Sequence, residues 1–219
     1  MFKKMPRTNR IVNETSLASK AYQLLLDQLL TKKLVPGMVL KRREIAQQLD
    51  MSVAPVLEAI IQLQSDGFLE SIPRQGTLVR AVHLQDFRGN LLLREAIECE
   101  AARIYGGKLV SEALNLPELA ARADASESKP IESLWRAECD FHTALVSLTQ
   151  CDLLVETFGK VMQRKLFSSL HLFLGGEAFG GGDHRTLLRE LQTSNPDRAE
   201  ALIRMHLRMR KEALFETIG

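Results

Sequence analysis

Cysteine is scarce in this sequence, with Cys99, Cys139 and Cys151 as the only three among 219 residues. Their odd number and wide spacing match neither a disulfide framework nor the close pairs of a zinc finger, so we expect reduced thiols that pack as small core residues. Long hydrophobic runs are also missing. No segment approaches the roughly 20 apolar residues of a membrane-spanning helix, and polar residues follow the basic start MFKKMPRTNR. The sequence therefore predicts a soluble cytoplasmic protein without a membrane partner.

A large net charge is absent as well, since the whole chain carries only +2. The charge is unevenly distributed along the sequence. Residues 1–80 contain 12 Lys and Arg and 7 Asp and Glu, a net charge of +5, whereas the remainder contains 17 and 20, a net charge of −3. This asymmetry indicates that a polyanion such as DNA binds the first part of the chain.

The segment over residues 36–79 predicts a winged helix-turn-helix, a fold that commonly binds duplex DNA. It follows a helix expected over 17–31, which Pro36 and Gly37 bring to an end. The residues expected to face inward from that first helix are Leu17, Ala21, Leu24, Leu25 and Leu29. A short helix is expected over 43–49, and residues 50–51 form the turn that follows it.

Ser52 begins the second helix of the motif, because its hydroxyl can accept a hydrogen bond from a free backbone N–H. Pro55 is tolerated in the first turn of that helix. Apolar side chains at helical spacing would bury one face against the preceding helix, and they are Val56, Ala59, Ile60 and Leu63. Two short strands around residues 73–76 then predict the hairpin of the wing.

The order PG..L, REIA..L, S..PV.EAI..L, DG.L and G..V closely resembles the DNA-binding domain of the GntR family of bacterial transcription regulators. The resemblance implies that DNA is contacted by Lys41, Arg42, Arg43, Ser52, Val53, Ala54, Leu57 and Arg74. Family members usually carry arginine where this chain has Val53 and Leu57. Because apolar side chains can touch thymine methyl groups, we expect binding to an operator that differs from the usual family site. Alternatively, the apolar residues form a protein contact patch.

Every periodic segment after the wing is helical, which predicts a mainly α protein with an all-helical C-terminal bundle. Helices are expected over 87–107, 130–149, 151–174, 183–193 and 196–218, with a loop over 175–182. We therefore divide the chain into a winged-helix domain over 1–80 with a basic arm up to about residue 13, a linker over 81–87, and a helical domain over 88–219.

Four side chains of the helical domain suggest a metal site. Glu138 and His142 are four residues apart and share one helix face, while His184 begins another helix and His206 lies in the last. One carboxylate and three imidazoles can bind a first-row divalent ion. The alternative is a polar pocket whose histidines contact an effector without a metal.

The segments LREAIECEAA, E..CDFHTAL, DHRTLL and RMHL look like the FCD domain of the FadR-type branch of the GntR family, over roughly residues 88–217. The resemblance implies that an acid and three histidines hold a divalent transition metal, zinc in the first place and nickel or manganese as alternatives. Glu138 stands where the family usually has aspartate. The resemblance also places Arg94 against the carboxylate of a small organic-acid effector. From the sequence alone, Arg94 can instead pair with Glu98, four residues further on.

These observations predict a DNA-binding transcription regulator, not an enzyme, that binds a palindromic operator as a homodimer and responds to a small carboxylate effector. Two other functions remain open. An acid with three histidines is also the equipment of a metal-dependent hydrolase. A dimeric scaffold whose winged helix contacts protein instead of DNA is the second alternative.

Overall fold

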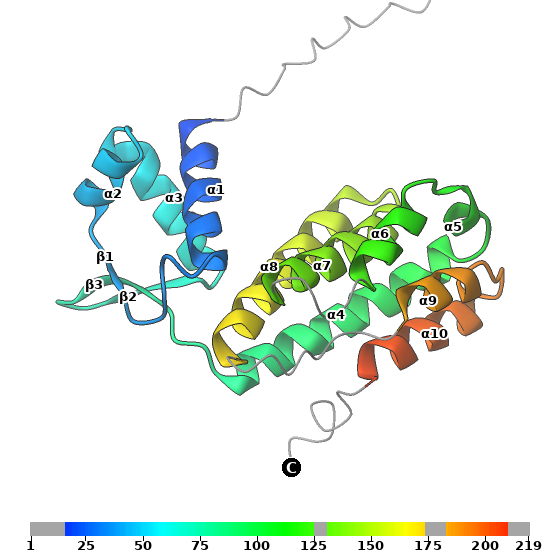
Figure 1. Cartoon of the computed structure of the whole chain (residues 1–219). Coiled ribbons are helices and arrows are strands. Elements are labelled where there is room, and N and C mark those ends of the chain that lie inside the picture. The colour runs from blue at the N-terminus through cyan, green and yellow to red at the C-terminus, as the bar shows by residue number, and fades with distance from the viewer. Residues whose placement is uncertain (1–15, 125–130, 174–182, 210–219) are drawn as a thin grey trace, which may run out of the picture.

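The structure is a computed structural model that describes residues 16–124, 131–173 and 183–209. It consists of a small winged-helix domain packed beside a larger helical bundle (Figure 1). Within the described residues, no helix combines the length and the apolar character needed to cross a bilayer. The predicted fold class, mainly α with a small hairpin wing, is confirmed.

The winged-helix domain has the expected elements together with one additional strand. In chain order they are α1 (Leu17–Leu30), β1 (Val39–Leu40), α2 (Arg42–Gln48), α3 (Val53–Ser65), β2 (Leu69–Ile72) and β3 (Gly76–Val79). The three strands form an antiparallel sheet in the order β1-β3-β2. The two-residue strand β1 was not predicted, because its stability comes from pairing with β3 and not from a local alternating pattern.

Two details of this domain differ from the sequence predictions. Leu17 and Leu24 were expected to face the core but are 59% and 39% exposed. The other predicted residues, Ala21, Leu25 and Leu29, are buried, and Tyr22, Leu26 and Leu30 are buried with them. Ser52 occupies the N-cap position of α3 as predicted, but its side chain makes no capping hydrogen bond. The turn between α2 and α3 is sharp, because Asp50 adopts a φ of +51°.

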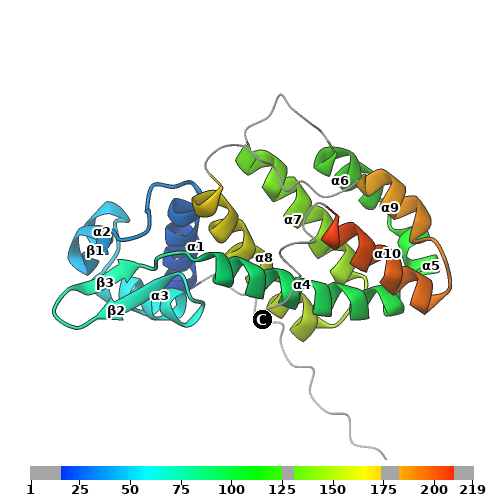
Figure 2. The ribbon, with the colours of Figure 1, turned by 90° about the horizontal axis from the view of Figure 1, so that it is seen from below.

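The helical domain is built around one long central helix. Its elements are α4 (Leu84–Tyr105), α5 (Lys108–Glu112), α6 (Leu116–Ala123), α7 (Ile131–Ser147), α8 (Asp152–Leu172), α9 (His184–Glu190) and α10 (Pro196–Arg208). Helix α4 packs against α10 along one side and against α8 and α7 along others (Figure 2). The short helices α5 and α6 were not predicted from the sequence.

The predicted linker over 81–87 is wrong in its second half, because α4 already begins at Leu84. Asp86 accepts a hydrogen bond from the backbone N–H of His83 at 3.1 Å, which caps the helix. Phe87 is buried, and its ring lies 5.1 Å from that of Phe173. The predicted arm up to residue 13, the loop over 175–182 and the end of the last helix over 210–218 lie outside the described residues.

Two hydrophobic cores hold the molecule together. One lies inside the helical bundle and contains buried residues from every helix from α4 to α10. The other combines the interior of the winged helix with four residues of the bundle, namely Trp135, Leu166, Phe167 and Leu170. The rings of Phe68 and Phe167 meet edge to face at 5.5 Å. The winged helix therefore packs directly onto α8 and α7.

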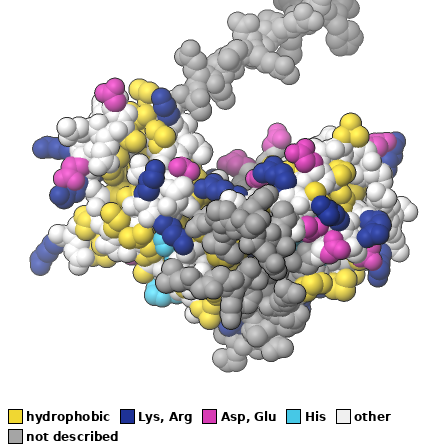
Figure 3. All heavy atoms as spheres, in the orientation of Figure 1, with side chains coloured by type: hydrophobic (Ala, Val, Ile, Leu, Met, Phe, Trp, Pro, Cys, Tyr) yellow, Lys and Arg dark blue, Asp and Glu magenta, His cyan; other side chains and the backbone are white. Residues whose placement is uncertain are grey.

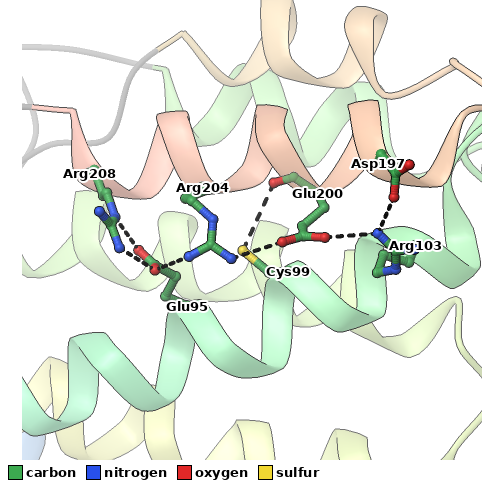
Figure 4. A network of polar contacts seen from close by, with 7 residues as sticks. All are labelled: Glu95, Cys99, Arg103, Asp197, Glu200, Arg204 and Arg208. Carbon is green, nitrogen blue, oxygen red and sulfur yellow. Dashed lines mark hydrogen bonds and ion pairs between the residues drawn. The ribbon is translucent and has the colours of Figure 1, made fainter.

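Ion pairs and hydrogen bonds join α10 to α4 (Figure 4). The members of this network are Glu95, Cys99 and Arg103 of α4 and Asp197, Glu200, Arg204 and Arg208 of α10. Glu95 is buried and accepts hydrogen bonds from both Arg204 and Arg208. Because this face of α10 packs against α4, His206 points into the interior of the bundle, where it is buried.

Candidate functional site

The predicted DNA-contacting side chains lie on the winged helix, and all but one are exposed. The exposed residues are Lys41, Arg42, Arg43, Ser52, Val53, Ala54 and Arg74. Leu57 is half-buried and therefore offers less apolar surface than predicted. Figure 3 shows Lys and Arg side chains along the outer edge of this domain, among hydrophobic ones.

Three elements of the winged helix position these side chains. Arg42 and Arg43 begin α2, and Val53 and Ala54 begin α3 directly after the turn. Arg74 lies in the turn of the wing with a φ of +66°. This arrangement combines exposed guanidinium groups, which suit phosphates or guanine edges, with apolar groups that suit thymine methyls.

Lys41 differs from the arginines because it has an acidic partner nearby. Its Nζ lies 2.9 Å from Oε1 of Glu44, and this hydrogen bond raises the pKa of Lys41. Both side chains are well exposed, so a phosphate can compete with Glu44 for the ammonium group.

The three histidines predicted as metal ligands come together inside the bundle. His142 of α7, His184 of α9 and His206 of α10 each offer a ring nitrogen, and these atoms lie within 4.8 Å of one another. All three side chains are buried. Within the described part of the chain, none of their Nε2 atoms has a hydrogen-bond partner. Three converging, unsatisfied imidazole nitrogens are costly unless something binds them, so the residues fit a divalent metal ion.

Two carboxylates orient the histidine rings. Oε2 of Glu98, on α4, lies 2.5 Å from Nδ1 of His142. Oδ1 of Asp124, after α6, lies 2.8 Å from Nδ1 of His184 and also accepts from the backbone N–H of that residue. A carboxylate at Nδ1 fixes the tautomer that leaves Nε2 free to bind a metal. Each carboxylate therefore holds its histidine ring in an orientation that would leave Nε2 free for a metal.

Burial also favours the neutral form of His142 and His206. It lowers the pKa of His142 well below the usual value, and the positive charge of Arg94 acts in the same direction. Burial likewise lowers the pKa of His206, with further contributions from His142 and His184. Both imidazoles are consequently neutral at neutral pH, the form that ligates metals.

Buried charges continue from the histidines toward α8. Nε and Nη1 of Arg94 lie 2.6 Å from Glu98 and 2.7 Å from Glu138, respectively. The other oxygen of Glu138 lies 3.0 Å from Nζ of Lys165. The ion pair of Arg94 with Glu98 that the sequence left open is thus present. Nη2 of Arg94 is buried and has no hydrogen-bond partner among the described residues.

Glu138 lies outside the group of three histidines that the structure brings together. Its two carboxylate oxygens are held by Arg94 and Lys165, so it pairs with cations here instead of joining the histidines. The sequence alone did not suggest this, because the partners lie 44 and 27 residues away.

Three other residues of the site were missed or assigned only a structural role. Glu98 was seen only as a partner of Arg94. Arg94 and Glu98 are four residues apart, and so are Glu138 and His142. This equal spacing is the sequence signal that the two pairs face each other on neighbouring helices. Asp124 and Lys165 gave no local signal.

Both domains match known protein families. Residues 17–79 match the family model described as "Bacterial regulatory proteins, gntR family", and residues 91–209 match the FCD domain. Together the two matches extend over most of the described residues and agree with the two structural units.

Relatives with names of their own are similar to parts or nearly all of the chain. The HTH-type transcriptional repressor RspR of Escherichia coli is 27% identical over 138 residues, which span 62% of this chain and 60% of that protein. A probable D-xylose utilization operon transcriptional repressor of Paenarthrobacter nicotinovorans is 25% identical over 93% of this chain and 91% of its own length.

Solved structures support the fold. A GntR-type putative transcriptional regulator from Rhodococcus sp. RHA1 superimposes with a TM-score of 0.72 at 22% identity, covering 94% of this chain and all of that one. E. coli McbR/YncC gives a TM-score of 0.69 at 22% identity, covering 93% and 99%.

Proposed function

Because this chain belongs to the gntR family of bacterial regulatory proteins and carries an FCD domain, we propose that it is a DNA-binding transcription regulator controlled from its helical domain. The observation that carries the proposal is the exposed row of basic and apolar side chains on α2, α3 and the wing. The named relatives are repressors, which does not favour a hydrolase or a scaffold without DNA activity. The proposed partner is duplex DNA with a palindromic operator, bound by a homodimer.

The helical domain supplies the proposed control site. FCD domains typically bind a metal, and His142, His184 and His206 are suited to hold one through Nε2. Zinc agrees best with three imidazole ligands, and nickel or manganese are alternatives. When bound, the ion supplies a Lewis-acidic centre with open coordination positions for an oxygen ligand.

The buried charges around the three histidines favour an anionic effector. Arg94 and Lys165 are balanced by Glu98 and Glu138, and Asp124 adds one negative charge at His184. A divalent ion would therefore leave the cluster with a net positive charge. Nη2 of Arg94 is buried and can donate to a carboxylate beside the ion. We therefore assign the effector to the small organic acids, with Arg94 as its binding residue.

The experiment that tests the function uses full-length protein and DNA flanking its own gene. We expect fluorescence anisotropy to detect a fragment that is bound with at least about a thousandfold preference over unrelated duplex at the same salt concentration. Equal affinity for all duplexes, together with a steep salt dependence, would indicate only nonspecific phosphate contacts.

Arg43→Ala is expected to weaken binding to this fragment by about 1–3 kcal/mol, because an arginine that contacts a base edge loses a bidentate hydrogen bond. Arg74→Ala serves as the comparison. If Arg74 contacts phosphate, its loss should be smaller and equal for specific and unrelated duplexes. Arg43 would be excluded as a base contact if its replacement weakened both kinds of duplex equally.

Asp124→Ala is expected to weaken zinc binding by about 10–100-fold, because the ring of His184 loses the carboxylate that orients it. Asp124→Asn is the matched control, since its amide oxygen still accepts from Nδ1–H. Competition with a chromogenic chelator measures both affinities. Equal zinc affinity in wild type and Asp124→Ala would show that this carboxylate does not position the ligand.

A further inference from the structure

Lys165 is a buried lysine in the middle of α8. Its side chain is 3% exposed, and Nζ lies 3.0 Å from Oε2 of Glu138. A buried ammonium group is stable only while an anion remains beside it. Any movement of the Glu138 carboxylate therefore disturbs Lys165.

Glu138 is held by two cationic side chains. Arg94 and Lys165 hold its two oxygens in this structure. His142 follows one turn later on α7, so the proposed metal would place a divalent cation near the same carboxylate. A carboxylate can accept only a limited number of hydrogen bonds. Attraction of the Glu138 carboxylate to the ion therefore weakens its ion pair with Lys165.

Helix α8 packs directly against the winged helix, so a displacement of α8 reaches that domain. Leu166, Phe167 and Leu170 belong to the hydrophobic core that the winged helix fills. The ring of Phe167 lies 5.5 Å from that of Phe68, the residue immediately before β2. Lys160 of α8 adds an ion pair to Asp66, at the end of α3, at 3.8 Å. A shift of α8 at Lys165 is thus transmitted through close packing, which does not deform continuously.

We propose that Lys165 is the positioning residue through which occupancy of the histidine pocket reaches the DNA-binding domain. The Lys165–Glu138 pair holds α8 in the place seen here. A divalent ion at the three histidines loosens this pair, and α8 repacks against the winged helix. The inference rests on the proposed metal site.

The test compares wild type with Lys165→Met, which keeps the apolar stem of the side chain and removes its charge. Full-length protein is titrated with zinc, and hydrogen exchange is followed in peptides from α1, α3 and α8. In wild type, zinc is expected to change exchange in all three helices. In Lys165→Met, zinc should bind about tenfold more tightly or better, because a competing cation is gone, and leave α1 and α3 unchanged.

Three further variants make the result specific. Lys165→Arg keeps the charge and should retain the response of α1 and α3, whereas Lys108→Met, an exposed lysine of α5, should behave as wild type. If Lys165→Met does not fold, Glu138→Gln breaks the same pair and should also remove the response. Zinc-induced changes in α1 and α3 that persist in Lys165→Met or Glu138→Gln would overturn the relay and leave the metal site intact. Failure of wild type to bind zinc would overturn both.

Discussion

Glu98→Ala is expected to lower the free energy of unfolding by about 3–5 kcal/mol, because it removes one partner from a fully buried ion pair. Arg94 would lose the carboxylate 2.6 Å from its Nε, and His142 would lose the acceptor at its Nδ1. Burial raises the pKa of Glu98, and the positive charge of Arg94 opposes this rise. Because each charge stabilises the other inside the protein, the loss of either one destabilises the site. Urea denaturation of metal-free protein measures the effect.

Glu98→Gln is the matched control, since it has nearly the same shape and retains one oxygen acceptor. It should cost less than Glu98→Ala. Glu112→Ala, in an exposed pair with Lys108, should change stability by no more than about 1 kcal/mol. A loss below about 1 kcal/mol for Glu98→Ala would contradict the view that this carboxylate supports the site.

The second large effect is expected from zinc itself. At a free zinc concentration about 1,000 times its Kd, one bound ion should stabilise the folded protein by about 4 kcal/mol, because the unfolded chain does not assemble the three ligands. His206→Ala should abolish most of this gain by leaving two histidines. Calorimetric melting with and without zinc, together with metal analysis near one ion per chain, measures it.

His83→Ala provides the control for that experiment, because His83 is exposed and lies in the N-cap of α4, away from the histidine cluster. Its zinc-dependent stabilisation should equal that of wild type. Wild-type protein whose melting temperature does not respond to zinc, nickel or manganese would contradict the metal site. The cluster would then be a polar pocket for an effector alone.

Much of the fold could be predicted because its signals are local. Helical spacing and turn residues identified α3, α7, α8 and the wing to within a few residues. The errors have physical causes that are not local. Whether Leu17 and Leu24 are buried depends on which face of α1 meets the rest of the domain. The start of α4 at Leu84 depends on the cap by Asp86 and on the burial of Phe87.

The candidate site was also predicted only where its signals are local. The three histidines were found by their residue type and by the family resemblance, and the structure brings them together. The partners of Glu138 could not be found in this way, because Arg94 and Lys165 come from two other helices. Asp124 is 60 residues from the histidine that it orients, and only the fold places it there. Sequence motifs thus identified the candidate ligands, whereas tertiary packing identified the groups that hold them.

We propose that two residues of α3 influence which operator the protein binds. Val53 is exposed and Leu57 half-buried, where family members usually carry arginine. The double substitution Val53→Arg with Leu57→Arg should change the preferred DNA sequence, since arginine prefers guanine where apolar groups prefer thymine.

Selection of bound sequences from a random duplex pool, with full-length protein at physiological salt, tests the central claim most directly. The proposed regulator predicts that repeated rounds enrich two inverted half-sites at a fixed separation, as expected when a symmetric dimer binds a palindromic operator. A pool that stays without a common motif, although the protein retains DNA, would contradict sequence-specific regulation by this chain.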